Sequence, residues 1–190
     1  MDEENILELS EQEKLYWWHI SRRSILQSVL DRFRAQFFCY PDLLLCHPER
    51  SRGISEPVLL NSSAPSPAGE SAQNDIRILD VGCGTGENFY WLSKFGEVTG
   101  ADTSELAVEL ADQKGKAVLG RTEDLPFEDG TFDLVTAFDV LEHVTDDAKV
   151  LQEWKRVLHS GGRLFLSVPA YQGLFGPHDR ALGHLRRYNL

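Results

Sequence analysis

The most informative segment of this chain is Ile78-Leu79-Asp80-Val81-Gly82-Cys83-Gly84-Thr85-Gly86. An apolar run that ends in glycines at alternate positions is typical of a buried strand followed by a tight turn. Gly82 permits the turn, Gly84 lets the backbone approach a ligand closely, and Gly86 lets the next helix pack against the sheet. The segment therefore predicts a strand, a ligand-binding loop and a helix, in that order.

Strands and helices alternate on both sides of this loop. We predict strands over Arg77–Val81, Glu97–Ala101, Ala117–Leu119, Phe132–Ala137 and Gly162–Val168, and helices over Asn88–Phe95, Ser104–Lys114 and Asp146–Leu158. Such alternation specifies right-handed crossovers and a mostly parallel sheet covered on both faces. The fold class is therefore α/β, a Rossmann-like three-layer αβα sandwich that binds its ligand at the carboxyl ends of the strands.

The chain has 190 residues, 42% of them hydrophobic, which suits one globular domain. Residues 1–40 show helical periodicity and predict amphipathic lid helices, one of them starting near Glu11. Core packing is the plainer interpretation of the aromatic residues there, and as part of a lid Trp18 would contact the substrate. Residues 41–74 are rich in Pro, Ser and Gly and predict a disordered insertion or linker. Residues 75–190 are left as the ligand-binding core.

The net charge and the absence of targeting signals limit the kinds of partner and the cellular location that we expect. The formal net charge of -11 repels phosphate backbones, so we expect no nucleic-acid partner and a small-molecule substrate. The N-terminus is acidic and no apolar run is long enough to span a bilayer, so we expect no membrane span and a cytoplasmic location. The three cysteines have no metal-ligand spacing. Nothing in the sequence indicates the oligomeric state.

The spacing of the glycines argues against a nicotinamide-dependent oxidoreductase. Dinucleotide-binding loops use G-x-G-x-x-G, whereas here the third glycine comes one residue early and Glu87 stands at the last position. A carboxylate beside a pyrophosphate is electrostatically unfavourable. The loop is instead expected to suit a ligand that carries positive charge.

The segment 78–86 resembles motif I of class I S-adenosylmethionine-dependent methyltransferases, most of all the methyltransferase type 11 and ubiquinone-biosynthesis-like small-molecule enzymes. The resemblance extends to about Tyr188 and implies S-adenosyl-L-methionine as cofactor. It places the methionine part of the cofactor on the loop, and we list Asp80, Gly82, Gly84 and Gly86 as cofactor-binding. Asp102 stands where the family binds the ribose, and a carboxylate there presents two oxygens to a vicinal diol. A helix cap for the segment from Ser104 is the alternative for Asp102.

The adenine position departs from the family pattern. Related proteins have Gly-Asp-Ala where this chain has Gly120-Arg121-Thr122, so Arg121 replaces the acid that reads the adenine amino group. Glu123 or Asp124 would have to take over that role. We list Thr122 as cofactor-binding through its backbone.

The fourth predicted strand leads into Asp139-Val140-Leu141-Glu142-His143, which resembles the segment beside the methionine end of the cofactor and the substrate. We expect Asp139 to contact the cofactor. In some ubiquinone-type O-methyltransferases an acidic-acidic-histidine trio holds a divalent cation, and Asp139, Glu142 and His143 match it. The plainer interpretation, which we adopt, is that these residues cap the next helix and contact the cofactor without a metal.

The segment after the last strand combines glycines with His, Tyr and Arg, a composition typical of substrate-contacting loops. We list His184 and Tyr188 as substrate contacts, and His143 and His178 as candidate general bases, because the pKa of histidine lies near neutrality. The predicted function is transfer of a methyl group to a small molecule, at oxygen or carbon rather than nitrogen. Five strands are found where the family has seven, so the alternative is a truncated, catalytically impaired cofactor-binding remnant or a module completed by a partner.

Overall fold

A computed structural model describes residues 24–32 and 76–189 of the chain. The predictions for Trp18, for the helix near Glu11 and for the insertion over 41–74 lie outside these residues. Residues 24–32 form a helix that belongs to the predicted N-terminal helical region. None of the helices in the described ranges is long and apolar enough to cross a membrane.

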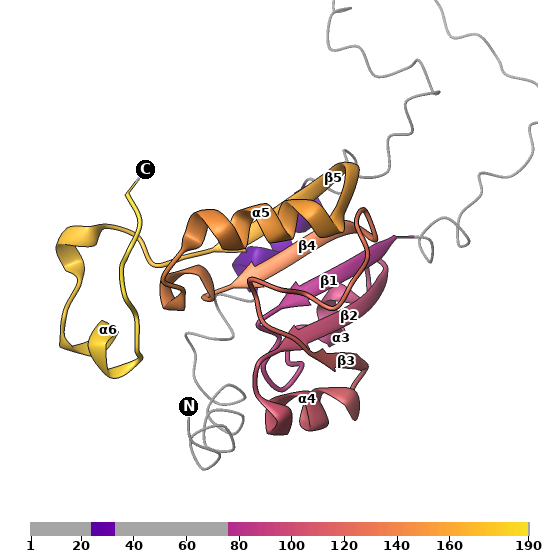
Figure 1. The fold of residues 1–190 in the computed structure, drawn as a ribbon, viewed down its shortest axis with the longest axis horizontal. Helices are drawn as coiled ribbons and strands as arrows, with labels where there is room; N and C mark the ends of the chain where they lie inside the picture. The colour runs from indigo at the N-terminus through magenta and orange to yellow at the C-terminus, as the bar shows by residue number, and fades with distance from the viewer. Residues whose placement is uncertain (1–23, 33–75, 190) are drawn as a thin grey trace, which may run out of the picture.

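The described residues build a five-stranded sheet in the order β3-β2-β1-β4-β5 (Figure 1). The strands are β1 (Arg77–Val81), β2 (Glu97–Asp102), β3 (Lys116–Leu119), β4 (Phe132–Phe138) and β5 (Leu158–Ser167). Every neighbouring pair is parallel, which confirms the predicted α/β fold. The strand order reverses between β1 and β4, so the carboxyl ends of these two strands mark the switch point where such sheets bind ligands.

Helices cover both faces of the sheet (Figure 1). They are α3 (Phe89–Leu92), α4 (Glu105–Asp112) and α5 (Asp147–Val157). On one face, α5 buries Val150, Trp154 and Val157 against Leu79 and Val135 of the central strands. On the other face, Leu30 of the 24–32 helix and Trp91 and Leu92 of α3 pack on Ile78 and Leu134. The alternation of Ile78 and Leu79 between the two clusters is the period-two pattern of a strand buried on both sides.

Two element boundaries differ from the sequence prediction by more than two residues. The helix predicted over Asn88–Phe95 is only one turn, α3, because the chain turns at Ser93 toward β2. The last strand begins at Leu158, directly after α5, and not at Gly162. Leu158 pairs with Phe132, and a register shift follows before Leu134 pairs with Arg163. The Gly161-Gly162 dipeptide therefore lies inside an irregular strand and does not precede it.

Short elements follow β4 and β5: η1 (Leu141–His143), η2 (Gln172–Leu174) and α6 (Pro177–Ala181). The chain after α6 runs back to the strand ends, where Tyr188 N–H donates to the Pro169 carbonyl at 2.9 Å and Tyr171 N–H donates to the Tyr188 carbonyl at 2.8 Å. In Figure 1 this returning segment, in yellow, stands beside the end of β4 and β5. We call residues 169–188 the C-terminal strap.

Candidate functional site

The glycine loop after β1 has the backbone that its sequence predicts. Gly82, Gly84 and Gly86 all have positive φ, at 66°, 54° and 78°. A Cβ atom at Gly82 would lie 2.4 Å from Val140 Cγ2, and one at Gly86 would lie 3.2 Å from the Cα atom of Ala111. A Cβ at Gly84 would meet nothing within 4 Å. Gly82 and Gly86 are therefore required by internal packing, whereas Gly84 leaves open space on the outer side of the loop.

Asp102 ends β2 beside this loop. Its Oδ2 atom accepts a hydrogen bond from the Gly84 N–H at 2.9 Å, and its Oδ1 atom accepts one from the Ser104 N–H at 3.0 Å. The cap of α4 is Ser104, whose hydroxyl accepts from the Ala107 N–H, so the alternative of Asp102 as the helix cap is wrong. Each carboxylate oxygen has a second lone pair, which leaves both oxygens able to accept a further hydrogen bond.

Asp80 lies beneath the loop and not at its surface. It is 1% exposed, and its Oδ1 atom accepts a hydrogen bond from the Thr136 hydroxyl of β4 at 2.6 Å. Asn88 donates to its other oxygen at 3.4 Å. Asp80 is thus placed to hold the loop against β4. The adjoining Cys83 is also buried, and this burial, followed by the charges of Asp80 and Asp102, raises the pKa of its thiol, as expected for an unreactive cysteine.

Glu87, which was expected to make the loop favour a positively charged ligand, forms an ion pair with Lys114. The Lys114 ammonium also donates to the Thr85 carbonyl of the loop at 2.7 Å. The carboxylate of Glu87 is therefore neutralised locally, and the preference for a charged ligand cannot rest on it.

Side chains at the predicted adenine position are engaged within the protein. Arg121 pairs with Glu123, which lowers the pKa of the Glu123 carboxyl, so Glu123 does not stand free to replace the family's acid. The Thr122 hydroxyl accepts a hydrogen bond from the indole N–H of Trp154 at 3.1 Å, and Trp154 is fully buried. The backbone of Thr122 and the exposed side chain of Asp124 are what remain for a ligand.

The end of β4 carries a strained residue. Asp139 has φ of 56°, which is uncommon for a residue other than glycine and clusters at functional sites. Its Oδ1 atom accepts from the Ser167 hydroxyl at 3.1 Å, and its N–H donates to the Ser167 carbonyl at 3.0 Å. These bonds join the carboxyl ends of β4 and β5. The N-terminal cap of α5 is Asp146. The expectation that Asp139, Glu142 and His143 cap this helix is therefore wrong.

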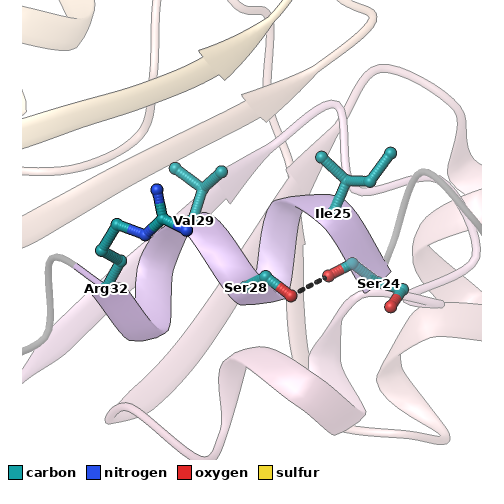
Figure 2. A pocket seen from close by; sticks show the side chains of 5 residues that line it. All are labelled: Ser24, Ile25, Ser28, Val29 and Arg32. Carbon is teal, nitrogen blue, oxygen red and sulfur yellow. Dashed lines mark hydrogen bonds between the residues drawn. The ribbon is translucent and has the colours of Figure 1, made fainter.

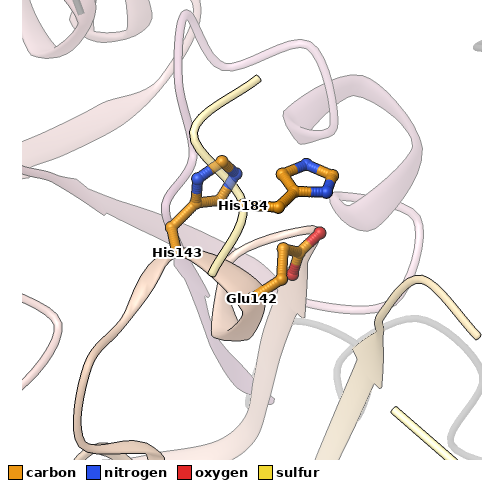
Figure 3. A group of neighbouring side chains, drawn as sticks. All are labelled: Glu142, His143 and His184. Atoms are coloured by element: carbon orange, nitrogen blue, oxygen red, sulfur yellow. The ribbon is translucent and has the colours of Figure 1, made fainter. Parts of the chain in front are cut away.

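Figure 3 shows a cluster that the sequence analysis did not predict. Glu142 and His143 of η1 meet His184 of the C-terminal strap, and one ligand atom from each lies within 4.8 Å of the others. Asp139, the third member of the predicted trio, is not in the cluster, and His184 takes its place. The imidazole rings of His143 and His184 pack edge to face with centroids 4.8 Å apart.

The other candidate residues, Tyr188, His178 and His143, lie in different surroundings. Tyr188 donates its hydroxyl to the Leu141 carbonyl at 3.1 Å, and burial raises its pKa. His178 is exposed on α6 and lies outside the cluster. Burial, followed by the charge of His184, lowers the pKa of His143. Of the two candidate bases, only His143 therefore belongs to a group of chemically active side chains.

A pocket also lies along the 24–32 helix (Figure 2). Ser24, Ile25, Ser28, Val29 and Arg32 line it. The Ser28 hydroxyl donates to the Ser24 carbonyl at 2.8 Å. None of these residues belongs to the glycine loop or to the strand ends, so the pocket is separate from the candidate site.

Comparison with known proteins finds a family match that contains the glycine loop, together with several similar proteins. Residues 79–166 match the family described as the methyltransferase domain. A demethylmenaquinone methyltransferase from Staphylococcus aureus is 43% identical over 97 residues, and a 27-O-demethylrifamycin SV methyltransferase from Amycolatopsis mediterranei is 35% identical over 119 residues. The solved structure of the Bacillus subtilis YcgJ protein has a TM-score of 0.56 and 29% identity.

These similarities cover parts of each protein. The two curated relatives are matched over 46% and 55% of this chain and over 40% and 44% of their own length, so the chain spans less than half of them. The YcgJ structure is matched over 62% of this chain and 58% of that one. The family match contains the glycine loop, Asp102 and the Asp139–His143 segment, and it ends before the C-terminal strap.

Proposed function

We propose that this chain, whose residues 79–166 match the methyltransferase domain family, is a class I S-adenosylmethionine-dependent methyltransferase that transfers a methyl group from S-adenosyl-L-methionine to a small molecule. The observation that carries the proposal is the bond of 2.9 Å between the Gly84 N–H and the Asp102 carboxylate. It joins the loop after β1 to the acid that ends β2, at the carboxyl edge of the sheet and next to the switch point between β1 and β4. This bond supports the proposal that the loop and Asp102 bind one ligand together.

The residues present fit this cofactor. The open side of Gly84 allows the backbone to approach a ligand, which a side chain at that position would obstruct. Asp102 retains lone pairs on both oxygens for the two ribose hydroxyls. The backbone of Thr122 borders the adenine position. Asp80 contributes indirectly, by holding the loop against Thr136.

The protein's part in catalysis is alignment. When bound, S-adenosyl-L-methionine supplies a methyl group on a positively charged sulfur. The chain has to hold the acceptor in line with that group and to exclude water, and such positioning supplies much of the rate gain without a covalent intermediate on the protein. Val140 packs directly against the glycine loop, which supports placing the segment after β4 beside the methionine end of the cofactor.

We assign the general base to His143. Its lowered pKa keeps the imidazole neutral at pH 7, the form that accepts a proton from a hydroxyl or an acidic carbon. His184 lies against the ring of His143, and Tyr188 anchors the strap that carries His184. His178 is the second candidate and would act only if α6 borders the acceptor.

A small-molecule acceptor, methylated at oxygen or carbon, is supported by two observations. The two named relatives carry the names of small molecules, demethylmenaquinone and 27-O-demethylrifamycin SV. The net charge of -11 is unfavourable for a nucleic-acid substrate.

Titration calorimetry with S-adenosylmethionine and S-adenosylhomocysteine tests the cofactor site. We expect micromolar binding, about -8 kcal/mol. Asp102→Asn should lose about 3 kcal/mol, or about 100-fold in Kd, because two hydrogen bonds to a charged acceptor are weakened. Glu109→Gln, which removes one carboxylate from the exposed side of α4, is the matched control. Wild-type affinity in a folded Asp102→Asn protein would exclude this site.

A further inference from the structure

We propose that Lys114, just after α4, is a positioning residue that holds the glycine loop in the conformation that binds the cofactor. Its ammonium donates to the Thr85 carbonyl at 2.7 Å and forms an ion pair with Glu87. Thr85 and Glu87 stand on either side of Gly86, so one side chain contacts the loop on both sides of its last glycine. The inference rests on the cofactor site proposed above and adds to it a residue from outside the loop.

The composition of the loop explains why an anchor is needed. Its three glycines all have positive φ, and glycine has the widest choice of backbone conformations. A loop with three glycines therefore loses much conformational entropy when it becomes ordered. Contacts that order the loop before the ligand arrives remove this cost from binding.

The first half of the loop is held by β2. The N–H groups of Gly82 and Cys83 both donate to the Ala101 carbonyl, at 2.8 and 3.2 Å. The Gly84 N–H donates to the Asp102 carboxylate at 2.9 Å. None of these bonds involves Lys114, so we expect this half to stay ordered when Lys114 is replaced.

The second half of the loop lies against α4. A Cβ atom at Gly86 would be 3.2 Å from the Cα atom of Ala111, and Phe89 packs in the same buried cluster as Ala111. Thr85 is 6% exposed, yet its hydroxyl has no hydrogen-bond partner among residues 24–32 and 76–189. Thr85 is therefore held through its carbonyl, by Lys114, and not through its side chain.

The bond to Lys114 also fixes the orientation of a whole peptide group. The Thr85 carbonyl and the Gly86 N–H belong to one planar trans peptide and point in opposite directions. On the other side of this peptide the Gly86 N–H donates to the Cys83 carbonyl at 3.0 Å. Lys114 is itself anchored, because its backbone N–H donates to the Ala111 carbonyl at 2.8 Å. The end of α4 thus sets the direction of the peptide between Thr85 and Gly86.

The ion pair with Glu87 has a smaller part in this arrangement. The side chain of Lys114 is 38% exposed and that of Glu87 is 18% exposed. Ion pairs between partly exposed side chains contribute little, because water and salt screen them. The bond to the Thr85 carbonyl, in contrast, acts directly on the backbone of the loop. The two contacts can therefore be tested separately.

Amide hydrogen exchange of the ligand-free full chain, followed by NMR, tests the effect on the loop. Lys114→Met removes the charge and the donors but keeps an unbranched side chain. We expect the N–H groups of Gly86 and Phe89 to exchange about fivefold faster, because local opening of the second half becomes easier. The Gly82 N–H, which is bonded to β2, should exchange as in the wild-type protein. Lys116→Met, at an exposed lysine, is the matched control and should change none of these rates.

Titration calorimetry with S-adenosylhomocysteine tests the effect on binding. The Kd should rise about five- to tenfold in Lys114→Met, because the loop must then be ordered when the ligand binds. Lys114→Arg keeps the charge and the donors and should restore both the affinity and the exchange rates. Glu87→Gln removes the ion pair but keeps the bond to Thr85, so its Kd should stay within about twofold of the wild-type value. Circular dichroism and urea unfolding identify any variant that is not folded, and Lys114→Gln replaces Lys114→Met in that case.

Three results would overturn the proposal. They are wild-type exchange at Gly86 and Phe89 in a folded Lys114→Met protein, faster exchange without a loss of affinity, and an equal loss of affinity in Glu87→Gln. A wild-type chain that does not bind S-adenosylhomocysteine would instead exclude the proposed cofactor site. The exchange rates of the ligand-free protein would still decide whether Lys114 orders the loop.

Discussion

Gly82 and Gly84 have similar backbones but different surroundings, and substitution of each by alanine should separate stability from binding. Alanine at Gly82 is strained by the positive φ, at about 1–2 kcal/mol. Its Cβ would also lie 2.4 Å from Val140 Cγ2, an overlap of the kind that costs about 1–3 kcal/mol. We expect Gly82→Ala to lower the free energy of unfolding by about 2–5 kcal/mol in total.

Gly84→Ala should lower the affinity for the cofactor while causing only a small loss of stability. Its Cβ would have no atom of residues 24–32 or 76–189 within 4 Å, so the variant should lose only the strain energy, about 1–2 kcal/mol. The new methyl group would occupy the open side on which the cofactor is proposed to lie, and affinity for S-adenosylhomocysteine should fall by at least about tenfold, or 1.4 kcal/mol. Gly130→Ala is the control for strain alone, because φ is 66° there and its nearest atom, His159 Cα, would be at 3.6 Å.

A double-mutant cycle makes the steric part measurable. Val140→Ala removes both Cγ atoms and leaves Cβ, at 3.5 Å, as the nearest atom of that residue. In this background Gly82→Ala should lose only the strain energy, which gives a coupling energy of about 1–3 kcal/mol. Urea unfolding followed by tryptophan fluorescence supplies the free energies, and calorimetry supplies the affinities. Absence of coupling between positions 82 and 140, or wild-type cofactor affinity in Gly84→Ala, would refute this reasoning.

Three further predictions concern polar contacts inside the fold. Thr136→Val removes the donor to the buried Asp80 carboxylate and should lower the free energy of unfolding by about 1–3 kcal/mol, whereas Thr103→Val, at an exposed threonine, should not. Thr122→Val removes the acceptor of the Trp154 indole and should destabilise by about 1 kcal/mol, while S-adenosylhomocysteine affinity stays within about twofold if only the Thr122 backbone binds. Hydrogen bonds from Arg156 lower the pKa of Glu153, so this carboxylate stabilises the fold above its ordinary pKa of 4.5 and the contribution is lost as the pH falls through the lowered folded value. Glu153→Gln should therefore flatten the loss of stability below pH 4.5, as measured by urea unfolding across that range, and an unchanged slope would contradict the assignment.

Much of the fold could be predicted because local signals agree with burial. The predicted first strand has the observed bounds, and the second and fourth differ by one residue at one end. The buried part of each strand is mainly apolar or small, and each strand ends in or is followed by glycine or an acidic residue, a pattern that burial on both faces favours. The start of β5 could not be predicted, because Leu158 joins the sheet through a register shift that depends on Phe132.

The candidate site also has one part that could be predicted from the sequence and one part that could not. The loop and Asp102 are adjacent along neighbouring strands, so spacing alone predicts their proximity. The cluster of Glu142, His143 and His184 depends on how the C-terminal strap returns to η1, and no local pattern specifies that path. A sequence motif can identify Asp139 as a candidate residue. Its hydrogen-bond partner, Ser167, follows from the pairing of β4 with β5 and not from the motif.

The strap also has a consequence for the order of assembly. Its bonds to Leu141, Glu142 and Thr145 join parts of the chain that are far apart in sequence, and such contacts form only after the intervening segment has been ordered. During synthesis on the ribosome, the sheet up to β4 emerges and can begin to fold before His184 has been made. The glycine loop would then be formed in a nascent chain that still lacks its histidine pair. Ligand capture by the loop can precede completion of the neighbouring cluster, which matures after the glycine loop.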